Sequence, residues 1–220
     1  MTQQVSFTQR TGVRRLISTH SLLLVTLVMT AFLLSGIPAG AESFGFDDDG
    51  VVITDHSQFD QINDVVIQPD GKIVAAGRTG DFFDEFTGRP SSMMVARYNS
   101  DGSLDDSFGT GGIVTTEFDG YAEAMGVALQ ADGKIVVAGT GGSSANNTLF
   151  AVVRYNTDGS LDETFAFGGV VTRRFGFVAR IMDLAIQSDG KIIVAGEGGS
   201  RGGATLARYN PDGLADVTFG

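Results

Sequence analysis

Acidic side chains around glycine turns are the first residues in this sequence that could do chemistry. Asn99–Asp106 has the pattern Asn-x-Asp-Gly-x-x-Asp-Asp, which returns at Asn156–Glu163 and, more weakly, at Asn210–Asp216. Oxygen ligands spaced around a glycine resemble part of a calcium loop. The bidentate Glu and one further Asp or Asn of a complete EF-hand loop are missing, however. Asn and Asp also cap turns by accepting hydrogen bonds from backbone N–H groups, and we prefer that interpretation here and at Asp47–Gly50.

Basic side chains recur with the same regularity. One arginine begins each copy of the motif Arg-Tyr-Asn-x-Asp-Gly, and one lysine follows each copy of Gln-x-Asp-Gly. They are Arg97, Arg154 and Arg208, and Lys72, Lys134 and Lys191. A ring of arginines could bind a carboxylate. We expect instead that each arginine pairs with a repeated Asp of the neighbouring loop and fixes the geometry of its unit, and that each lysine stays in solvent.

Residue types that carry out catalysis are scarce. The chain has no Cys, which excludes a thiol nucleophile, a Cys-ligated zinc site, an iron–sulfur cluster and a disulfide scaffold. It has two histidines, His20 and His56, and no Gly-x-Ser-x-Gly motif. Catalysis needs an asymmetric cluster, whereas the polar residues here recur in every unit. We therefore assign no catalytic, cofactor-binding or metal-ligating residue.

The segments between the third and fourth predicted strands differ most between units. They are residues 78–90, 141–147 and 198–203. Variation on a rigid frame is where binding specificity usually lies. The first segment holds three aromatic rings among three acids: Phe82, Phe83 and Phe86 with Asp81, Asp84 and Glu85. These rings either form an exposed contact patch or fold back over their own unit.

Two motifs divide the chain into repeats. The arginine motif recurs at spacings of 57 and 54 residues, and the lysine motif, which begins at Gln68, Gln130 and Gln187, recurs at spacings of 62 and 57. Residues 97–109 and 154–166 are identical at 9 of 13 positions without a gap. Such a period indicates a repeat architecture, in which each unit is one supersecondary element.

Each repeat is predicted to form four short strands, which in the second unit span residues 112–118, 124–130, 134–140 and 150–156. Along the second strand, large and small residues alternate, so we expect Met125, Val127 and Leu129 on one face and Ala124, Gly126 and Ala128 on the other. The equivalent large residues are Val65 and Ile67 in the first unit, and Met182, Leu184 and Ile186 in the third.

The last two strands of each unit read as buried. Ile135–Gly139 is apolar throughout, as expected for a strand that is covered on both faces. The fourth strand places Val153 and Tyr155 on one side, and Val152 and Arg154 on the other. The Asp-Gly pair between the second and third strands favours a tight hairpin, because Gly accepts a positive φ.

Four antiparallel strands in each repeat predict an all-β fold built from the four-stranded blades of a β-propeller. About three repeats are present, which makes an incomplete propeller. A β-sandwich built from the same hairpins is the alternative. A β-helix is disfavoured, because one coil would need neither so long a repeat nor an Asp-Gly hairpin within it.

The combined motif resembles a known family. The pattern is Arg-Tyr-Asn-x-Asp-Gly-Ser-Leu-Asp-x-x-Phe-Gly, then Gly-[Ile/Val]-Val-Thr, then Gln-x-Asp-Gly-Lys-Ile-[Val/Ile]-Val-Ala-Gly. It is similar to the delta-60 repeat, and the resemblance covers nearly all of residues 44–220. Delta-60 repeats are similar to β-propeller blades and occur in secreted or surface proteins of bacteria, usually in longer arrays. The resemblance brings no established catalytic residue.

The N-terminal segment has the features of an export signal. Residues 1–41 hold Arg10, Arg14 and Arg15, no acid, the apolar run Leu22–Leu34 and the cleavage-type sequence Ala39–Ala41. The apolar run is shorter than the ~20 residues that a membrane-spanning helix needs. A cleaved signal peptide that forms a helix is therefore predicted, with an uncleaved anchor as the alternative. Either way, the rest of the chain is expected outside the cytoplasm, secreted or at the bacterial cell surface.

These features give a predicted organisation of the chain. It is a signal peptide at 1–41, repeats at 42–107, 108–164 and 165–218, and the start of a further repeat at 219–220. Three blades are fewer than the four to eight that usually close a propeller, and an open stack exposes sheet edges. We expect a fragment or truncated frame of a longer protein, with a subunit that closes by oligomerising as the alternative.

Composition narrows the function. The net charge is −11, and removal of residues 1–41 makes it −14, which argues against a nucleic-acid partner. We expect a non-enzymatic binding or structural module, with a protein or glycan of the cell surface as its partner, no membrane contact beyond the leader and no cofactor. Self-association through open blade edges is a further expectation. The alternative is a share of a larger propeller enzyme, a hydrolase or lyase with its active site in the central channel.

Overall fold

A computed structural model describes residues 42–43, 50–80, 91–144, 146–176, 178–199 and 202–220. The predicted signal-peptide helix, Asp47–Asp49 and the Phe82–Phe86 segment lie outside the described residues. The chain divides into a unit of residues 1–40 and a unit of residues 41–220, and the second unit is the subject here. No helix in the described part has the length and apolar character needed to span a bilayer.

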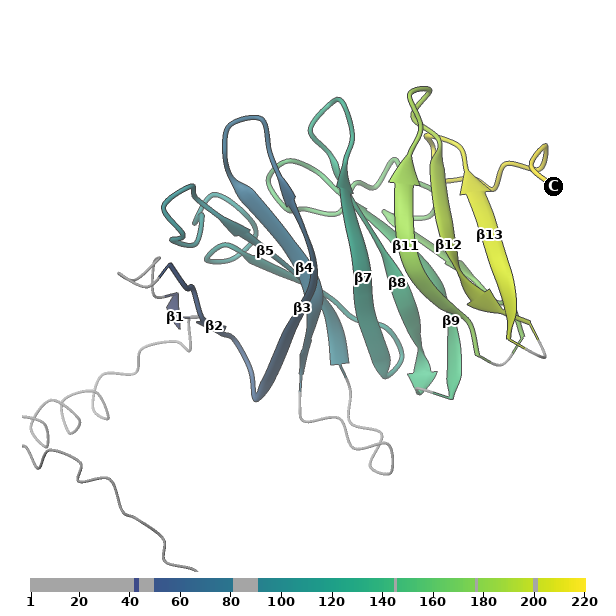
Figure 1. The fold of residues 1–220 in the computed structure, drawn as a ribbon, viewed down its shortest axis with the longest axis horizontal. Helices are drawn as coiled ribbons and strands as arrows, with labels where there is room; N and C mark the ends of the chain where they lie inside the picture. The colour runs from purple at the N-terminus through teal and green to yellow at the C-terminus, as the bar shows by residue number, and fades with distance from the viewer. Residues whose placement is uncertain (1–41, 44–49, 81–90, 145, 177, 200–201) are drawn as a thin grey trace, which may run out of the picture. The chain divides into compact units, whose positions relative to one another are not determined.

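Three antiparallel sheets form in chain order (Figure 1). The first contains β3 (Phe59–Ile67), β4 (Ile73–Gly80), β5 (Ser91–Tyr98) and β6 (Ile113–Thr116). The second contains β7 (Tyr121–Leu129), β8 (Ile135–Ser144), β9 (Asn147–Tyr155) and β10 (Val170–Arg173). The third contains β11 (Arg180–Ile186), β12 (Ile192–Gly198) and β13 (Gly203–Tyr209). A short pair, β1 (Glu42–Ser43) and β2 (Thr54–Asp55), precedes them. The fold is thus all-β and propeller-like.

The first strand of the predicted second unit belongs to a different sheet from the other three. Residues 113–116 form β6, which pairs with β5 of the preceding repeat, with Val114 opposite Val95. In the same way, β10 pairs with β9, with Val171 opposite Val152. The sequence repeat and the sheet are therefore out of phase by one strand. The prediction that the four strands of one sequence repeat form one sheet is wrong for the first strand. The short outer strand follows the motif loop of its own sheet, which delivers it to that sheet's free edge.

The Asp-Gly hairpins form as predicted. Between β7 and β8, the N–H of Gln130 donates to the carbonyl of Lys134 at 2.9 Å, and the N–H of Gly133 donates to that of Gln130 at 2.9 Å. Gly133 has a φ of 84°, and its counterparts Gly71 and Gly190 have φ values of 87° and 82°. A side chain with a Cβ rarely adopts this conformation, so the glycine of the motif is required by the turn.

A β-bulge interrupts the predicted alternation of the inner strands. In β7, Ala124 pairs with Gly139 and Gly126 pairs with Ala138, so Met125 is the extra residue. Ala124 consequently lies in the same core cluster as Val127 and Leu129, and the expected separation of large and small faces is wrong at this point. Equivalent register shifts occur at Asn63 in β3 and Met182 in β11. The bulge is a repeated feature of the fold.

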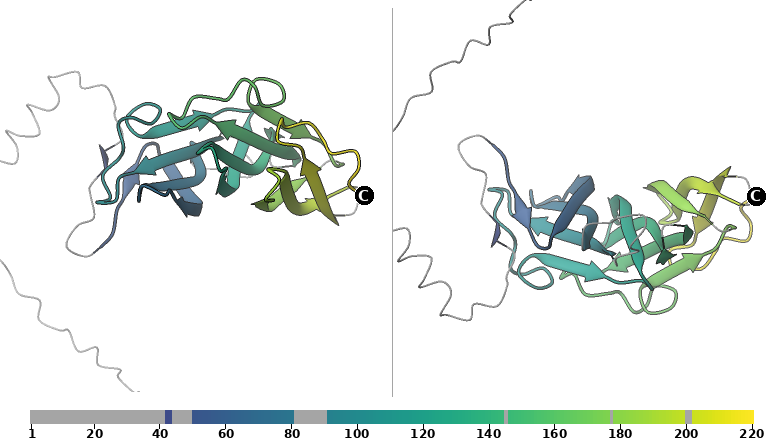
Figure 2. Two further views of the ribbon diagram at one scale, coloured as in Figure 1. Left: turned by 90° about the horizontal axis from the view of Figure 1, so that it is seen from above. Right: turned by 90° about the horizontal axis from the view of Figure 1, so that it is seen from below.

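Two apolar cores join the three sheets, which follow one another in chain order in Figure 2. Ile135 and Val137 of β8 lie in the core shared with the first sheet, and Val136 and Ala138 lie in the core shared with the third. The prediction that this strand is covered on both faces is confirmed. The fourth strand also has its predicted orientation, because Val153 and Tyr155 lie in the first core and Val152 lies in the second.

The variable segment of the second unit is mostly strand. β8 continues through Ser144 and β9 starts at Asn147, so most of the expected loop at 141–147 is strand. In the third unit, β12 ends at Gly198 and β13 begins at Gly203. The backbone hydrogen bonds of a sheet ladder thus continue through Gly-rich and Ser-rich sequence that composition alone assigns to a loop.

Candidate functional site

The recurring charged residues form one cluster in each sheet. In the second sheet, the Asp162 carboxylate oxygen Oδ2 accepts hydrogen bonds from Arg154 Nε at 2.7 Å and Lys134 Nζ at 2.7 Å. The other oxygen, Oδ1, accepts from the N–H and hydroxyl of Thr164. Asp162 is buried, with a relative exposure of 3%. The first and third sheets repeat the cluster with Arg97, Lys72 and Asp105, and with Arg208, Lys191 and Asp216.

Arg154 and Arg97 also reach beyond their own hydrogen-bonded loops. The guanidinium of Arg154 lies 4.4 Å from the ring centroid of Phe165, a cation–π contact, and donates to the carbonyl of Pro211 at 2.5 Å. Arg97 contacts Phe108 in the same way and donates to the carbonyl of Thr157. The clusters of the first and second sheets therefore join each of these sheets to the loop of the next one.

Hydrogen bonding keeps these buried aspartates ionised. Burial acts to raise the pKa of Asp162, but the hydrogen bonds from Lys134 and Thr164 and the charge of Arg154 outweigh it and hold the pKa well below its usual range. The pKa of Asp105 is lowered in the same way, against its burial, by Lys72 and Ser107. The pKa of Asp216 is lowered first by the Thr218 hydroxyl. Carboxylates held in this state are poor proton donors or acceptors near neutral pH.

These contacts test two predictions about the basic residues. The expectation that each repeated arginine pairs with a repeated Asp of a neighbouring loop is confirmed. The expectation that the lysines stay in solvent is wrong, because Lys134 is ion-paired with Asp162 and its side chain is only 27% exposed. The hairpin brings each lysine over the acidic loop of the same sheet, a contact between residues 28 positions apart in the sequence.

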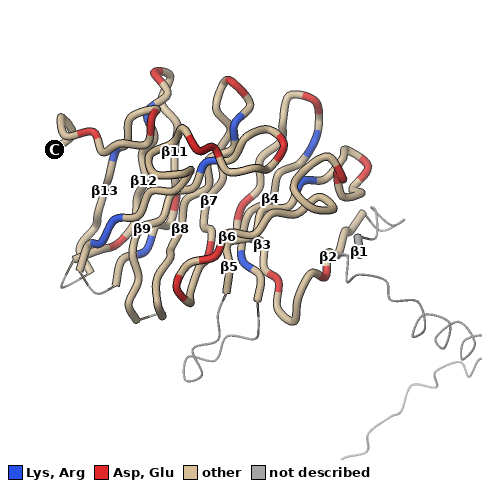
Figure 3. Tube along the Cα trace, turned by 180° about the vertical axis from the view of Figure 1, so that it is seen from behind, with Lys and Arg blue, Asp and Glu red and all other residues tan. Residues whose placement is uncertain are grey.

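The candidate calcium loops use their carboxylates within the protein. Asp158 Oδ1 accepts hydrogen bonds from the N–H and the hydroxyl of Ser160, as expected for a turn cap. Asp162 of the same loop is directed to the arginine–lysine cluster instead. Over the part of the chain that the structure describes, no group of three or more His, Asp or Glu side chains is placed to hold a metal ion. Figure 3 shows the acidic residues mainly in the turns that connect the strands.

A second polar cluster lies on the inner strands and does not repeat. Glu123 of β7 accepts hydrogen bonds from Asn63 Nδ2 at 3.0 Å and from the Tyr121 hydroxyl at 2.5 Å, and it lies 4.0 Å from Arg78 Nε. Burial, together with the hydrogen bond and the charge of Glu123, raises the pKa of Tyr121. The position of Glu123 is taken by Gln61 in β3 and by Arg180 in β11.

The repeated motifs do not reveal this cluster, because they contain only the residues that the repeats share. The useful signal is the reverse, a polar position whose charge changes from repeat to repeat. Arg78 aligns with Thr140 in the second unit and with Glu197 in the third. The Oε1 atom of Glu197 lies 3.8 Å from Nη1 of Arg180. The predicted contact segment of the first unit, with Phe82, Phe83 and Phe86, lies outside the described residues. His56 lies in the described part, exposed, beside Asp60.

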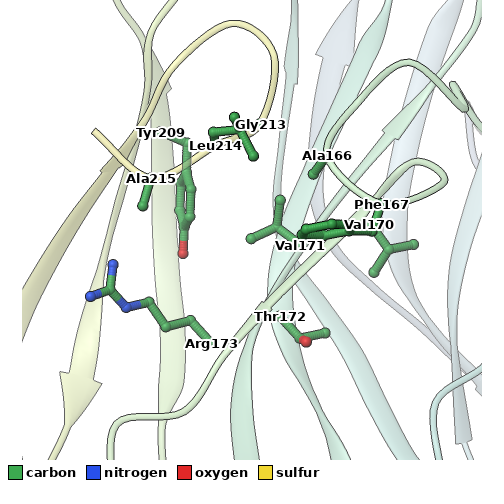
Figure 4. A pocket seen from close by; sticks show the side chains of 10 residues that line it. All are labelled: Ala166, Phe167, Val170, Val171, Thr172, Arg173, Tyr209, Gly213, Leu214 and Ala215. Carbon is green, nitrogen blue, oxygen red and sulfur yellow. The ribbon is translucent and has the colours of Figure 1, made fainter. Parts of the chain in front are cut away.

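A pocket of about 610 Å³ lies beside the third sheet (Figure 4). Apolar side chains that include Phe167, Val171 and Leu214 line it, and Arg173 and Tyr209 are its polar members. The Tyr209 hydroxyl is buried and has no hydrogen-bond partner among the described residues, whereas Tyr155 bonds to the Thr116 hydroxyl at 2.6 Å. Arg173 occupies the position of Thr116 in the alignment of the repeats, which accounts for the difference.

Comparison with known proteins is consistent with this fold. A family model described as "Domain of unknown function (DUF5122) beta-propeller" matches residues 68–108, 130–165 and 187–219. A solved structure described as a "putative gluconolactonase" is 18% identical, with a TM-score of 0.33 over 77% of this chain and 52% of that one. The chain spans about half the length of that protein. No curated protein matches. The three matched segments carry the two motifs and the clusters that they build, and the chain belongs to the DUF5122 β-propeller family.

Proposed function

We propose that this chain is an exported, non-enzymatic β-propeller module of the delta-60 kind, with a binding or structural role at the bacterial cell surface. The observation that carries the proposal is the repetition of the buried charges. Asp105, Asp162 and Asp216 have the same partners in every sheet, and their pKa values are all lowered. Groups built alike in each repeat suit a scaffold, because an active site needs one residue that differs from the others.

The sequence of the leader supports the location. A basic segment, an apolar run and a small-residue cleavage site precede the first repeat. The net charge of −11 disfavours nucleic acid as the partner and leaves a protein or a glycan of the cell surface.

Export is tested by expressing the full chain in a bacterium and measuring its N-terminus and its sensitivity to protease added to intact cells. We expect a chain that begins at Glu42 and is degraded by external protease. Leu24→Asp, which places a charge in the apolar run, should leave uncleaved chain inside the cell, and Leu24→Val should behave as the unchanged protein. A protease-resistant, uncleaved chain of unchanged sequence would contradict the proposal.

One observation favours the enzyme as a second candidate. Glu123, Asn63 and Arg78 form an asymmetric polar group on the inner strands, where the channel of a propeller would lie. Hydrolysis of lactone or ester substrates by the purified chain, abolished by Glu123→Gln and retained in the control Glu163→Gln, would support that candidate and contradict the non-enzymatic proposal. Equal rates with and without the chain are expected.

A further inference from the structure

The polar cluster around Glu123 lies where the first and second sheets meet. β3 and β7, the inner strands of these two sheets, lie side by side (Figure 1), and each stands at one end of the strand order in its sheet. Asn63 of β3 donates hydrogen bonds to Glu123 and to the carbonyl of Ala124 in β7, so the cluster bridges the two sheets. The Glu123 cluster consists of Gln61, Asn63, Arg78, Tyr121 and Glu123.

Hydrogen bonds fix the carboxylate of Glu123 in place. Asn63 Nδ2 donates to its Oε1 atom, and the Tyr121 hydroxyl donates to its Oε2 atom. Gln61 Nε2 in turn donates to Oδ1 of Asn63 at 2.7 Å, which fixes the orientation of that amide. An ionised carboxylate can accept about four hydrogen bonds, so each oxygen of Glu123 can accept a further one. Glu123 is therefore an oriented acceptor with unused capacity.

Arg78 places donors beside this acceptor. Its guanidinium carbon lies 4.6 Å from the ring centroid of Phe59, a cation–π contact that holds the group in position. The distance of 4.0 Å between Arg78 Nε and Glu123 Oε1 is an ion pair but too long for a hydrogen bond, and this Nε has no hydrogen-bond partner among the described residues. The side chains of Arg78 and Glu123 are 15% and 17% exposed, so both can contact a ligand.

The charges of the cluster define the class of ligand. Arg78 and Glu123 balance each other, and the remaining members are two amides and a phenol. Arg180 of the neighbouring β11 is itself paired with Glu197. An anionic ligand would be repelled by Glu123 and a cationic one by Arg78. A hydroxyl group suits both, because it can donate to the carboxylate and accept from the guanidinium.

We propose that the Glu123 cluster binds a neutral sugar, whose adjacent hydroxyl groups donate to Glu123 and accept from Arg78. Between the second and third sheets the equivalent positions hold Met125, Thr140 and Arg180, so the described part of the chain has one such site. The inference rests on the proposed binding function and selects a glycan, rather than a protein, as the partner.

Saturation-transfer NMR on the purified chain tests this site with three neutral probes, methyl β-glucoside, methyl β-galactoside and methyl α-mannoside. At least one of them should receive saturation from the protein, with a Kd of about 1 mM, as expected for a ligand of this size. The signal should disappear when an excess of the same sugar without its methyl group is added. No transfer to any of the three probes would overturn the proposal.

Two charge variants separate binding from a purely structural role. Glu123→Gln leaves Arg78 as the charged member of the cluster, so it should weaken binding of the neutral probe about 10-fold and allow glucuronate to bind. Arg78→Gln has the opposite charge effect and should allow protonated glucosamine to bind at pH 6. Glu163→Gln, on an exposed loop residue, is the matched control and should change neither preference. Variants that lose stability in thermal unfolding but keep the preference of the unchanged chain would overturn the proposal.

The outcome of this experiment is separate from the outcome of the export test. A chain that is exported but binds no sugar would overturn the site and leave the location intact. A chain that binds sugar but is retained inside the cell would support the site and contradict the proposed location. Conversion of the bound probe, visible as new resonances, would support the site and contradict the non-enzymatic proposal.

Discussion

At the scale of single residues, the three buried aspartates combine functions that usually belong to separate groups. Asp162 orders its loop through one oxygen and pairs with two cations through the other. A buried ion pair stabilises a fold only when hydrogen bonds satisfy its remaining polar atoms, and in each cluster a Ser or Thr hydroxyl donates to the second carboxylate oxygen. Each cluster joins a hairpin to a motif loop, and the first two also reach the loop of the next sheet, so the repeated charges position the strands.

The lowered pKa of Asp162 gives a prediction for the pH dependence of stability. Because the pKa is lower in the folded chain than its value of about 3.9 in the unfolded chain, the carboxylate stabilises the fold above about pH 4 and loses that effect as the pH falls toward the folded pKa. Asp162→Asn should cost about 3 kcal/mol at pH 7 and flatten the acid dependence below pH 4.

Urea unfolding between pH 2 and pH 7 measures this effect. Glu163→Gln is the matched control, because Glu163 is the exposed neighbour of Asp162, and it should leave the curve unchanged. A variant Asp162→Asn that kept the full acid dependence would show that other groups cause it.

Tyr155 and Tyr209 occupy the same position in successive repeats, but only the Tyr155 hydroxyl has a hydrogen-bond partner in the described part of the chain. Tyr155→Phe removes the hydrogen bond to Thr116 and should lower the free energy of unfolding by about 1 kcal/mol. Tyr209→Phe removes a buried hydroxyl that has no partner in the described part of the chain, so it should leave stability unchanged or raise it by up to about 1 kcal/mol. Chemical denaturation of both variants checks the difference, and equal losses would refute the assignment.

At the scale of elements, the β-bulge explains why a glycine recurs inside the third predicted strand of each unit, at Gly77, Gly139 and Gly196. A Cβ at Gly139 would lie 2.0 Å from the carbonyl oxygen of Glu123, and the same contact recurs at Gly77 and Gly196. The bulge brings the inner strand's backbone against the neighbouring strand at this point, so the position admits no side chain.

Gly139→Ala should therefore lower the free energy of unfolding by about 3 kcal/mol, because a rigid backbone atom blocks the added methyl group. Gly203→Ala is the matched control in another strand, since the nearest atom to its Cβ is 3.6 Å away, and it should change stability by less than about 0.5 kcal/mol. Thermal unfolding of both variants measures the difference. Similar stabilities for the two would mean that the bulge relaxes.

The sequence predicted the elements better than their connections. Hairpins, the doubly covered third strand and the arginine–aspartate pairs are local or repeated features, and each follows from residue type and period. The sheet to which β6 belongs, the lysine contacts and the Glu123 cluster depend on pairing between distant residues. Alternation also failed at Met125, because a bulge adds one residue to a strand without a marked change in composition.

At the scale of the whole molecule, the apolar cores between the sheets hold the stack together. Val152→Asp places a charge in the core between the second and third sheets and should lower the free energy of unfolding by about 3 kcal/mol or more. Val217→Asp is the matched control, because Val217 is 92% exposed and the other repeats have Asp106 and Glu163 at this position. Urea unfolding followed by circular dichroism measures the difference. A Val152→Asp variant as stable as the control would contradict the assigned core.

Urea unfolding at pH 7 of three variants, Asp105→Asn, Asp162→Asn and Asp216→Asn, tests the central claim most directly. If the repeated charge clusters hold the sheets in place, each variant should lose about 3 kcal/mol of its free energy of unfolding. Variants that are all as stable as the unchanged protein would contradict the account.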